Sequence, residues 1–317
     1  MTSRFSPSIS SAEFQACIAA LWVFPIKSCA GISVQQAVLT PTGLAHDRAW
    51  MVVDAQGEMV TQRELPRMAL IQPELVHEGD ALTALVLHAP DVTSWTLTLD
   101  PAATAASEAC RVRVWNDDVP AFDMGPEVGQ WLTDFLGGSL GALRLVQFDM
   151  RHPRLSSQQW TQGVQALNQF SDGFPVLVTS TASLDELNTR LHAQGEAAVD
   201  MRRFRANVVL GHSDAPHAHA MLPHDEDRVG TLSFQAQADA HGEAVQLKPV
   251  KPCPRCPMPN IDPDSAQIHP VVSDVLQAYR QDPRVKGALT FGMNCMPVAG
   301  VGQVLRVGQH VSADWAF

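Results

Sequence analysis

K-P-C-P-R-C-P-M-P-N-I-D, at residues 251–262, is the stretch that decides how this chain is interpreted. It holds Cys253 and Cys256 in a C-x-x-C spacing, which is typical of a redox dithiol, half a zinc site or a metal-binding thiolate. In a thioredoxin-like dithiol the second cysteine lies in the first turn of a helix. Pro257 and Pro259 follow it at once here, and no helical period begins before Val271. The dithiol interpretation is therefore disfavoured.

A structural zinc site needs a second close pair of cysteine or histidine ligands. The other cysteines, at positions 17, 29, 110 and 295, stand alone. In the third interpretation one thiolate binds a soft metal, prolines keep the backbone rigid around it, and a cofactor supplies the other ligands. The residues alone leave these alternatives open.

Basic residues are clustered although the chain as a whole is acidic. It has 33 Asp and Glu against 22 Lys and Arg, a formal net charge of -11. Arginine forks commonly hold phosphate or carboxylate groups. The clusters are therefore either surface charges at strand ends or the walls around one anionic cofactor. They are Lys248, Lys251 and Arg255; Arg202, Arg203 and Arg205, followed by Asn207; Lys27 with Ser28; and Arg48 alone.

The composition is that of a globular protein, with 45% hydrophobic and 17% charged residues over 317 positions. Its net negative charge argues against general binding to nucleic acids and against binding to an anionic membrane surface. The longest mostly apolar run, residues 17–26, is shorter than the roughly 20 residues that span a bilayer, so we expect no membrane span.

The N-terminus and the cysteines bear on the compartment. Residues 1–16 are Ser-rich without an apolar signal segment, and we expect them to form a disordered tip. The six cysteines do not form a disulfide framework, which favours a reducing cytoplasm. The His-containing segment at 214–227, preceded by His212, is predicted to be a solvated loop rather than a metal site.

Short strands dominate the predicted secondary structure. Residues 49–53 and 58–62 flank a turn at 54–57 and predict a hairpin. Further strands are predicted at 174–179, 206–210, 231–235, 244–250 and 303–307. Strands neither alternate regularly with helices nor carry a phosphate-loop glycine pattern. We therefore expect a mostly β, α+β fold, with an antiparallel barrel rather than a doubly wound sheet.

Three helices are predicted. Pro126 begins the first, and Gly137 ends it. The capping box at residues 183–186 begins the second, which ends by Gly195. The third runs from about Val271 to Gln281 and is stopped by Pro283.

Six sequence blocks, taken in order, resemble the MOSC superfamily. The likeness is closest to the branch of mitochondrial amidoxime-reducing components and their bacterial relatives, and it covers residues 18–312. The resemblance implies an antiparallel β-barrel MOSC domain with an N-terminal MOSC-associated β-rich domain. With a glycine-rich seam at 137–141, we place these domains at 149–317 and 17–148. The blocks are FPIKSCAG (24–31), GLAHDRAWMVVD (43–54), MVTQRELPRMALI (59–71), FSDGFPVLVTSTASLDELNTRL (170–191), MRRFRANVVL (201–210) and KPCPRCPMPNIDPDSA (251–266).

The resemblance also implies a molybdenum–molybdopterin cofactor. It places the catalytic, metal-ligating cysteine at Cys256. The basic clusters coincide with the motif blocks, so the charge pattern agrees with this assignment. The positions that match residues holding the pterin and its phosphate are Lys27, Ser28, Arg48, Thr179, Ser180, Arg205, Asn207, Pro254 and Arg255.

The activity implied is the reduction of small N-hydroxylated compounds, a two-electron cleavage of the N–O bond that releases water. Only Cys295 follows Cys256, too few cysteines for the cluster of an appended ferredoxin-like domain. We therefore expect electrons from a separate flavin, haem or iron–sulfur protein. Two alternatives remain: a molybdenum-cofactor-binding or persulfide sulfur-transfer module with sulfur on Cys256, and an interaction protein with a degenerate site.

Overall fold

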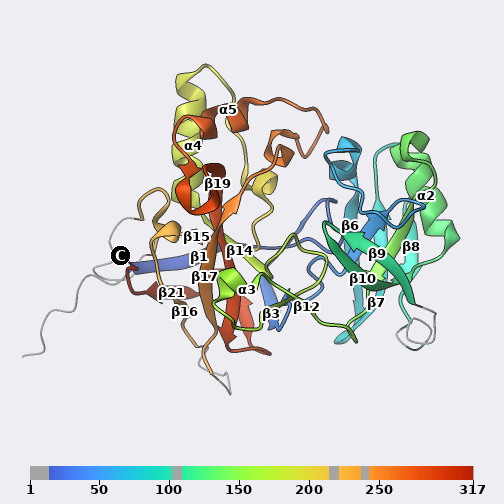
Figure 1. Ribbon diagram of the computed structural model, residues 1–317, viewed down its shortest axis with the longest axis horizontal. Coiled ribbons are helices and arrows are strands. Elements are labelled where there is room, and N and C mark those ends of the chain that lie inside the picture. The colour runs from blue at the N-terminus through green and yellow to red at the C-terminus, as the bar shows by residue number, and fades with distance from the viewer. Residues whose placement is uncertain (1–13, 101, 103–108, 214–220, 237–242, 317) are drawn as a thin grey trace, which may run out of the picture.

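A closed barrel dominates the computed structural model, which describes residues 14–100, 102, 109–213, 221–236 and 243–316 (Figure 1). Seven described strands form the ring, because β19 pairs back onto β14. The expected mostly β fold with a barrel is confirmed. In ring order the strands are β14 (Val176–Ser180), β15 (Val208–Gly211), β1 (Phe14–Val23), β21 (His310–Ala313), β16 (Leu232–Phe234), β17 (Gln246–Pro254) and β19 (Ala288–Ala299).

One pair in this ring is parallel, which makes the barrel mixed rather than wholly antiparallel. Strands β14 and β15 run in the same direction, and parallel neighbours need a crossover connection. Helix α4 (Thr181–Ala193) and the short helix η3 (Met201–Phe204) form that crossover. Helix α5 (Val271–Gln277) packs against α4, and both lie at one end of the barrel (Figure 1).

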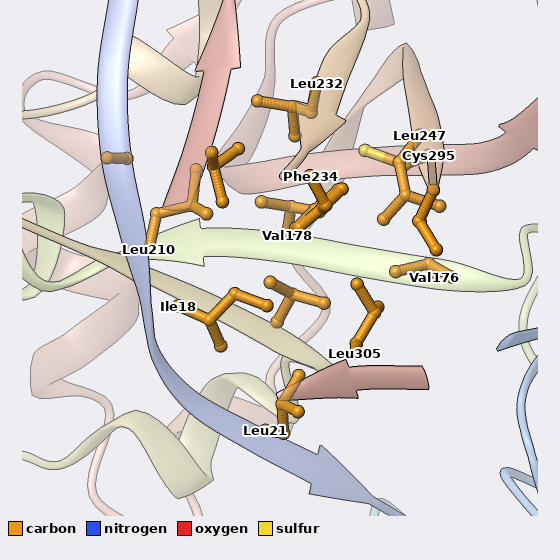
Figure 2. Packing of buried hydrophobic residues seen from close by; sticks show 14 of the residues in the cluster. Ile18, Leu21, Val176, Val178, Leu210, Leu232, Phe234, Leu247, Cys295 and Leu305 are labelled. Atoms are coloured by element: carbon orange, nitrogen blue, oxygen red, sulfur yellow. The ribbon is translucent and has the colours of Figure 1, made fainter. Parts of the chain in front are cut away.

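The barrel interior is filled by alternate residues of its strands. Ile18 and Leu21 of β1 are completely buried, as are Val178 of β14 and Leu210 of β15. Figure 2 shows their side chains together with those of β16, β17 and β19 in one cluster. Truncating such a side chain to alanine costs about 2–5 kcal/mol, so the ring is held by its core as well as by its hydrogen bonds.

A second, N-terminal β-rich part lies beside the barrel, to the right in Figure 1. It contains one four-stranded and one three-stranded sheet, and α2 (Pro126–Leu136) packs on β11. The sheets are β5 (Trp50–Val53), β11 (Arg144–Phe148), β10 (Asp117–Asp123) and β9 (Ala109–Val114), and β6 (Gln72–Glu78), β7 (Ala81–His88) and β8 (Trp95–Thr98).

Short elements complete the chain. Strand β3 (Gln36–Thr40) pairs with β4 (Gly43–Leu44) and with β20 (Val304–Arg306). None of the helices in the described ranges is both long and apolar enough to cross a membrane. The remaining elements are β2 (Ile32–Val34), β12 (Arg154–Leu155), β13 (Leu167–Asn168), β18 (Gln281–Asp282), α3 (Gln158–Thr161), η1 (Pro66–Leu70), η2 (Gly138–Leu140), η4 (Asp225–Asp227), η5 (Met258–Asn260) and η6 (Pro283–Val285).

The first strand of the chain belongs to the barrel rather than to the N-terminal β-rich part. Strand β1 pairs with β15 on one side and with β21 on the other. Residues 14–16, expected within the disordered tip, begin this strand, and Phe14 and Ala16 are buried. Residues 1–13 lie outside the described ranges, and the domain limits at 17–148 and 149–317 stay predictions.

The predicted helices and hairpin are found with shifted limits. Helix α2 runs from Pro126 to Leu136, as expected. The capping box at 183–186 was placed too late, because α4 begins at Thr181 and Ser180 is its N-cap. Helix α5 ends at Gln277, since Gln281 already pairs with β19. The turn at 54–57 forms, but its second strand is reduced to a single bridge between Val53 and Met59.

Residues 224–226 are buried, which contradicts the solvated loop expected there. Glu226 is 1% exposed and accepts hydrogen bonds from the hydroxyls of Ser180 (2.8 Å) and Ser183 (2.7 Å). His224 lies above the Tyr279 ring, whereas residues 214–220, with two of the histidines, lie outside the described ranges. Within those ranges no cluster of three His, Cys, Asp or Glu is placed to hold a metal.

The Glu226 carboxyl makes stability depend on pH. Burial raises its pKa to about 7, so the folded protein favours the protonated form. The stability this gives is present at acidic pH and is lost as pH rises through 7. Between pH 6 and pH 8 the wild-type free energy of unfolding should fall by about 1 kcal/mol more than that of Glu226→Gln, measured by urea titration.

Glu127→Gln, which removes an exposed acid in the first turn of α2, is the control and should keep the wild-type pH dependence. Equal pH slopes in the wild type and Glu226→Gln would contradict the assignment of this dependence to Glu226.

Candidate functional site

One cleft brings together segments that are far apart in the sequence. Its walls come from the barrel, from the loop that follows β1 and from the N-terminal β-rich part. Arginine, lysine and apolar side chains predominate. The cleft is lined by Lys27, Ser28, Arg48, Thr61, Arg63, Trp115, Ser171, Asp172, Gly173, Phe174, Leu177, Phe204, Arg205, Asn207, Cys253, Pro254, Arg255, Cys256, Met258 and Asn294.

Cys256 reaches the cleft because β17 ends just before it. The strand stops at Pro254, and the Arg255 N–H makes one more hydrogen bond, of 2.7 Å, to the Leu289 carbonyl of β19. The short helix η5 then turns the chain away. Cys256 is left partly exposed and outside any α-helix, so a thioredoxin-like dithiol is not built here.

Two arginines of the cleft share one aromatic ring. The guanidinium carbons of Arg205 and Arg48 lie 4.3 and 4.5 Å from the centre of the Phe24 ring. Arg48 pairs with Asp47 and also donates to the Arg205 carbonyl, at 3.0 Å. Arg205 donates from Nη1 to the Cys29 carbonyl, while its buried Nη2 has no hydrogen-bond partner.

Arg205 is therefore a cation without a carboxylate partner of its own. Burial and the neighbouring Arg48 charge lower the pKa of its guanidinium to about 9. Arg255 shows a related deficit, because its Nε is buried without a partner while its other nitrogens bond Cys253 Sγ (3.1 Å) and the Phe204 carbonyl (2.9 Å). Orphaned donors on two cations fit a negatively charged ligand, such as the phosphate of a pterin cofactor.

Lys27 and Asp172 form an ion pair on another wall of the cleft. The Lys27 ammonium also donates to the Phe170 carbonyl, at 2.9 Å. Burial lowers the pKa of Lys27, although the Asp172 charge opposes this shift. The Lys27 charge and hydrogen bonds from Lys27 and Trp115 hold the pKa of Asp172 below its usual range. Asp172 is a carboxylate at neutral pH.

Residues with a strained backbone conformation cluster in the same cleft. Ser28, Arg48, Arg205 and Trp115 have φ values of 67°, 50°, 57° and 57°, in the left-handed region that non-glycine residues rarely adopt. Each such residue costs about 1–3 kcal/mol and persists only where the surroundings hold it. All four line the cleft, and such strain often occurs at functional sites, so the cleft is the candidate functional site.

Sequence comparison identifies the two parts of the chain. Residues 15–139 match the MOSC N-terminal beta barrel domain, and residues 166–312 match the MOSC domain. The chain belongs to the MOSC-domain family.

Several curated relatives resemble this MOSC-domain protein over most of its length. It is 32% identical to mitochondrial amidoxime reducing component 2 of Homo sapiens, over 83% of this chain and 72% of that protein. It is 34% identical to mitochondrial amidoxime-reducing component 1 of Mus musculus, over 83% and 71%. A molybdenum cofactor sulfurase of Drosophila mojavensis is 31% identical over 75% of this chain and 27% of that protein.

Most of the residues that sequence analysis assigned to the cofactor line the cleft of this MOSC-domain protein. They are Lys27, Ser28, Arg48, Arg205, Asn207, Pro254, Arg255 and Cys256. Asn207 differs from the others because its amide is used by the backbone: Oδ1 accepts from the Leu177 N–H (3.1 Å), and Nδ2 donates to the Trp22 carbonyl (3.2 Å). It therefore ties β1 and β14 together beside the cleft.

Thr179 and Ser180 do not line the cleft. Both are completely buried. The Thr179 hydroxyl donates to Met201 Sδ (3.3 Å), and Ser180 caps α4 and donates to Glu226. Their side chains hold the crossover in place, and their geometry gives no support for an assignment to the cofactor.

Sequence analysis missed Asp172, Trp115 and Arg63. Asp172 lies inside one of the motif blocks, but only the fold shows that it pairs with Lys27. Trp115 and Arg63 come from the N-terminal β-rich part, and their approach to the cleft depends on how the two parts pack. Arg63 also lies inside a motif block, at 59–71, whereas the signal for Trp115 was a tryptophan in a short turn between two strands.

The orphaned donors of Arg205 predict an anion-dependent gain in stability. For protein without cofactor, inorganic phosphate at ten times its dissociation constant should raise the melting temperature by about 2 °C. Arg205→Met should abolish the rise, because it removes the unpaired guanidinium.

Arg113→Met is the matched control, since Arg113 pairs with Glu58 and Asp118 on the surface and does not line the cleft. A rise that survives in Arg205→Met would show that phosphate binds elsewhere.

Proposed function

We propose that this MOSC-domain protein is a molybdenum-cofactor-dependent reductase of N-hydroxylated compounds. The observation that carries the proposal is the cleft itself. Two partly exposed cysteines, Cys253 and Cys256, line it together with Arg205 and Arg255, each of which has one buried nitrogen without a partner. A thiolate ligand next to an anion cradle is what a metal bound through a phosphorylated organic cofactor requires. The likeness to proteins named amidoxime reducing components supports the choice of reaction.

Distinct side chains would hold the two ends of a molybdenum–molybdopterin cofactor. Cys256 Sγ would be the protein ligand of the metal. The guanidinium groups of Arg205 and Arg255 would receive the phosphate, while Lys27 and Arg48 add positive charge. When bound, the cofactor supplies two-electron redox chemistry at molybdenum. Pro254 and Pro257, on either side of Arg255 and Cys256, limit the backbone motion of this segment.

Reduction of an N–OH group to N–H takes two electrons and two protons and releases one water. Asp172 is not suited to supply a proton, because its lowered pKa keeps it ionised. It is suited to accept a hydrogen bond from the N–H or O–H of the substrate, since its side chain is 68% exposed. Lys27 keeps this carboxylate in place through their ion pair.

The electrons would come from a separate protein carrying flavin, haem or an iron–sulfur centre, and we propose a cytoplasmic location for the reaction. The alternative of a persulfide carrier uses the same thiol differently. In that case Cys256 would hold sulfur covalently, and the protein would not need permanently bound molybdenum.

Cys256→Ser tests this choice. Protein produced in a host that makes molybdopterin should contain about one molybdenum per chain. Cys256→Ser should lose most of this metal and all reduction of benzamidoxime by a chemical electron donor. Elemental analysis and product chromatography give the two readouts.

Cys110→Ser is the matched control, because Cys110 is a partly exposed cysteine of β9 outside the cleft. Wild-type protein that lacks molybdenum but carries a persulfide on Cys256 would overturn the reductase proposal in favour of sulfur transfer.

A further inference from the structure

Trp115 occupies the edge of the cleft, on the N-terminal β-rich part. It stands in the two-residue turn that joins β9 to β10, where Val114 pairs with Asp117. Although it is a large aromatic residue, 42% of its surface is exposed. Turns of this length usually contain glycine, asparagine or aspartate at the positions with positive φ.

Two interactions fix the indole despite its strained backbone. Its φ is 57°, a genuine outlier for so bulky a residue. Its Nε1 donates a hydrogen bond of 3.1 Å to Asp172 Oδ1. The Arg63 guanidinium stacks 4.5 Å from the centre of the indole. The Arg63 guanidinium lies over one face of the ring, and 42% of the Trp115 surface remains exposed.

The indole and the carboxylate together form a recognition element. Both hydrogen bonds that Asp172 accepts from side chains, from Lys27 and from Trp115, end on Oδ1, which leaves Oδ2 for a donor group of a ligand. Phe174 and Leu177 add apolar surface to the same cleft. A flat ring carrying an N–H or O–H group next to it would stack on Trp115 and donate to Asp172.

We propose that Trp115 forms an aromatic wall of the substrate site and gives this protein a preference for planar aromatic N-hydroxylated substrates over small aliphatic ones. The inference rests on the proposed reductase function. Offset stacking between aromatic rings favours binding about five-fold beyond the burial of area. An aliphatic amidoxime presents the same polar group to Asp172 but has no ring to stack.

Two variants separate an aromatic wall from a merely structural role. Trp115→Ala removes the ring and the hydrogen bond to Asp172. Trp115→Phe keeps an aromatic face, although a smaller one, and removes the hydrogen bond. Trp131→Ala is the matched control, because Trp131 is also a half-buried indole with a hydrogen-bonded Nε1, to the Thr93 carbonyl (2.8 Å), and it does not line the cleft.

The experiment compares benzamidoxime with acetamidoxime on molybdenum-loaded protein. Steady-state kinetics give kcat and KM for each, and calorimetry gives the dissociation constants with oxidised enzyme, which does not turn over. In the wild type benzamidoxime should bind at least about five-fold more tightly than acetamidoxime. Trp115→Ala should lose this ratio, mainly through the KM of benzamidoxime, whereas Trp115→Phe and Trp131→Ala should keep it.

Each outcome decides the inference. An unchanged ratio in Trp115→Ala would overturn it, and so would equal losses in Trp115→Phe and Trp115→Ala, which would reduce Trp115 to a support for Asp172. If loaded wild-type enzyme reduces neither compound, the proposed function fails. The calorimetric ratio then still shows whether Trp115 binds aromatic amidoximes.

Discussion

Closure of the barrel is the constraint on which the rest of the molecule depends. The ring closes where β19 pairs with β14, and this contact has no room for a side chain at Gly292. A Cβ there would lie 2.6 Å from the Val178 carbonyl oxygen, and the φ of Gly292 is 80°. Once the ring is closed, the loop after β1, the segment before β15 and the end of β17 lie around one cleft. These segments carry Lys27, Arg205 and Cys256.

The residues that line the cleft favour ligand binding but lower the stability of the free protein. Arg48, Arg205 and Lys27 carry positive charge that is wholly or partly removed from water, which costs free energy unless each cation is paired. The fold compensates only in part, through Asp47, Asp172 and the shared face of Phe24. The unpaired donors lower the stability of the ligand-free protein, and an anionic ligand that pairs with them would raise it again. Ligand binding and folding are therefore linked. The positive φ values of the four strained residues in the cleft walls lower the free energy of unfolding further.

How much the sequence predicts depends on whether a property is local. Short strand-like runs predicted four of the seven barrel strands, β14, β15, β16 and β17, but not β1, β19 or β21. The expected end of β17 at residue 250 was too early, because the strand continues through Pro252 to Pro254 with an irregular register against β19. The parallel pairing of β14 with β15 was not predicted, since it depends on the crossover through α4. The N-cap of α4 was misplaced because Ser180 and Ser183 both suit that role. Ser180 takes it, because its backbone is extended and its hydroxyl oxygen accepts a hydrogen bond from the Ser183 N–H.

In the candidate site, too, the sequence predicts some residues and only the fold reveals others. A motif tells which positions matter but not where their side chains point, so Thr179 and Ser180 were grouped with residues that line the cleft. Arg205 and Arg255 were identified because charge stands out in an acidic chain. Trp115 was missed because nothing near it in sequence indicates the cleft. Only the packing of the N-terminal β-rich part against the barrel brings its indole to Asp172.

The pairing of β1 with β21 has a consequence for how the protein is made. The first described strand of the chain lies next to one of the last, so the ring cannot close during synthesis until β21 has left the ribosome. Contacts of such long sequence separation form slowly, and their apolar edges stay exposed in the meantime. Strand β1 also leads directly into the loop that carries Lys27 and Ser28. The closed barrel, and with it the cleft, is therefore assembled only after translation has passed residue 313.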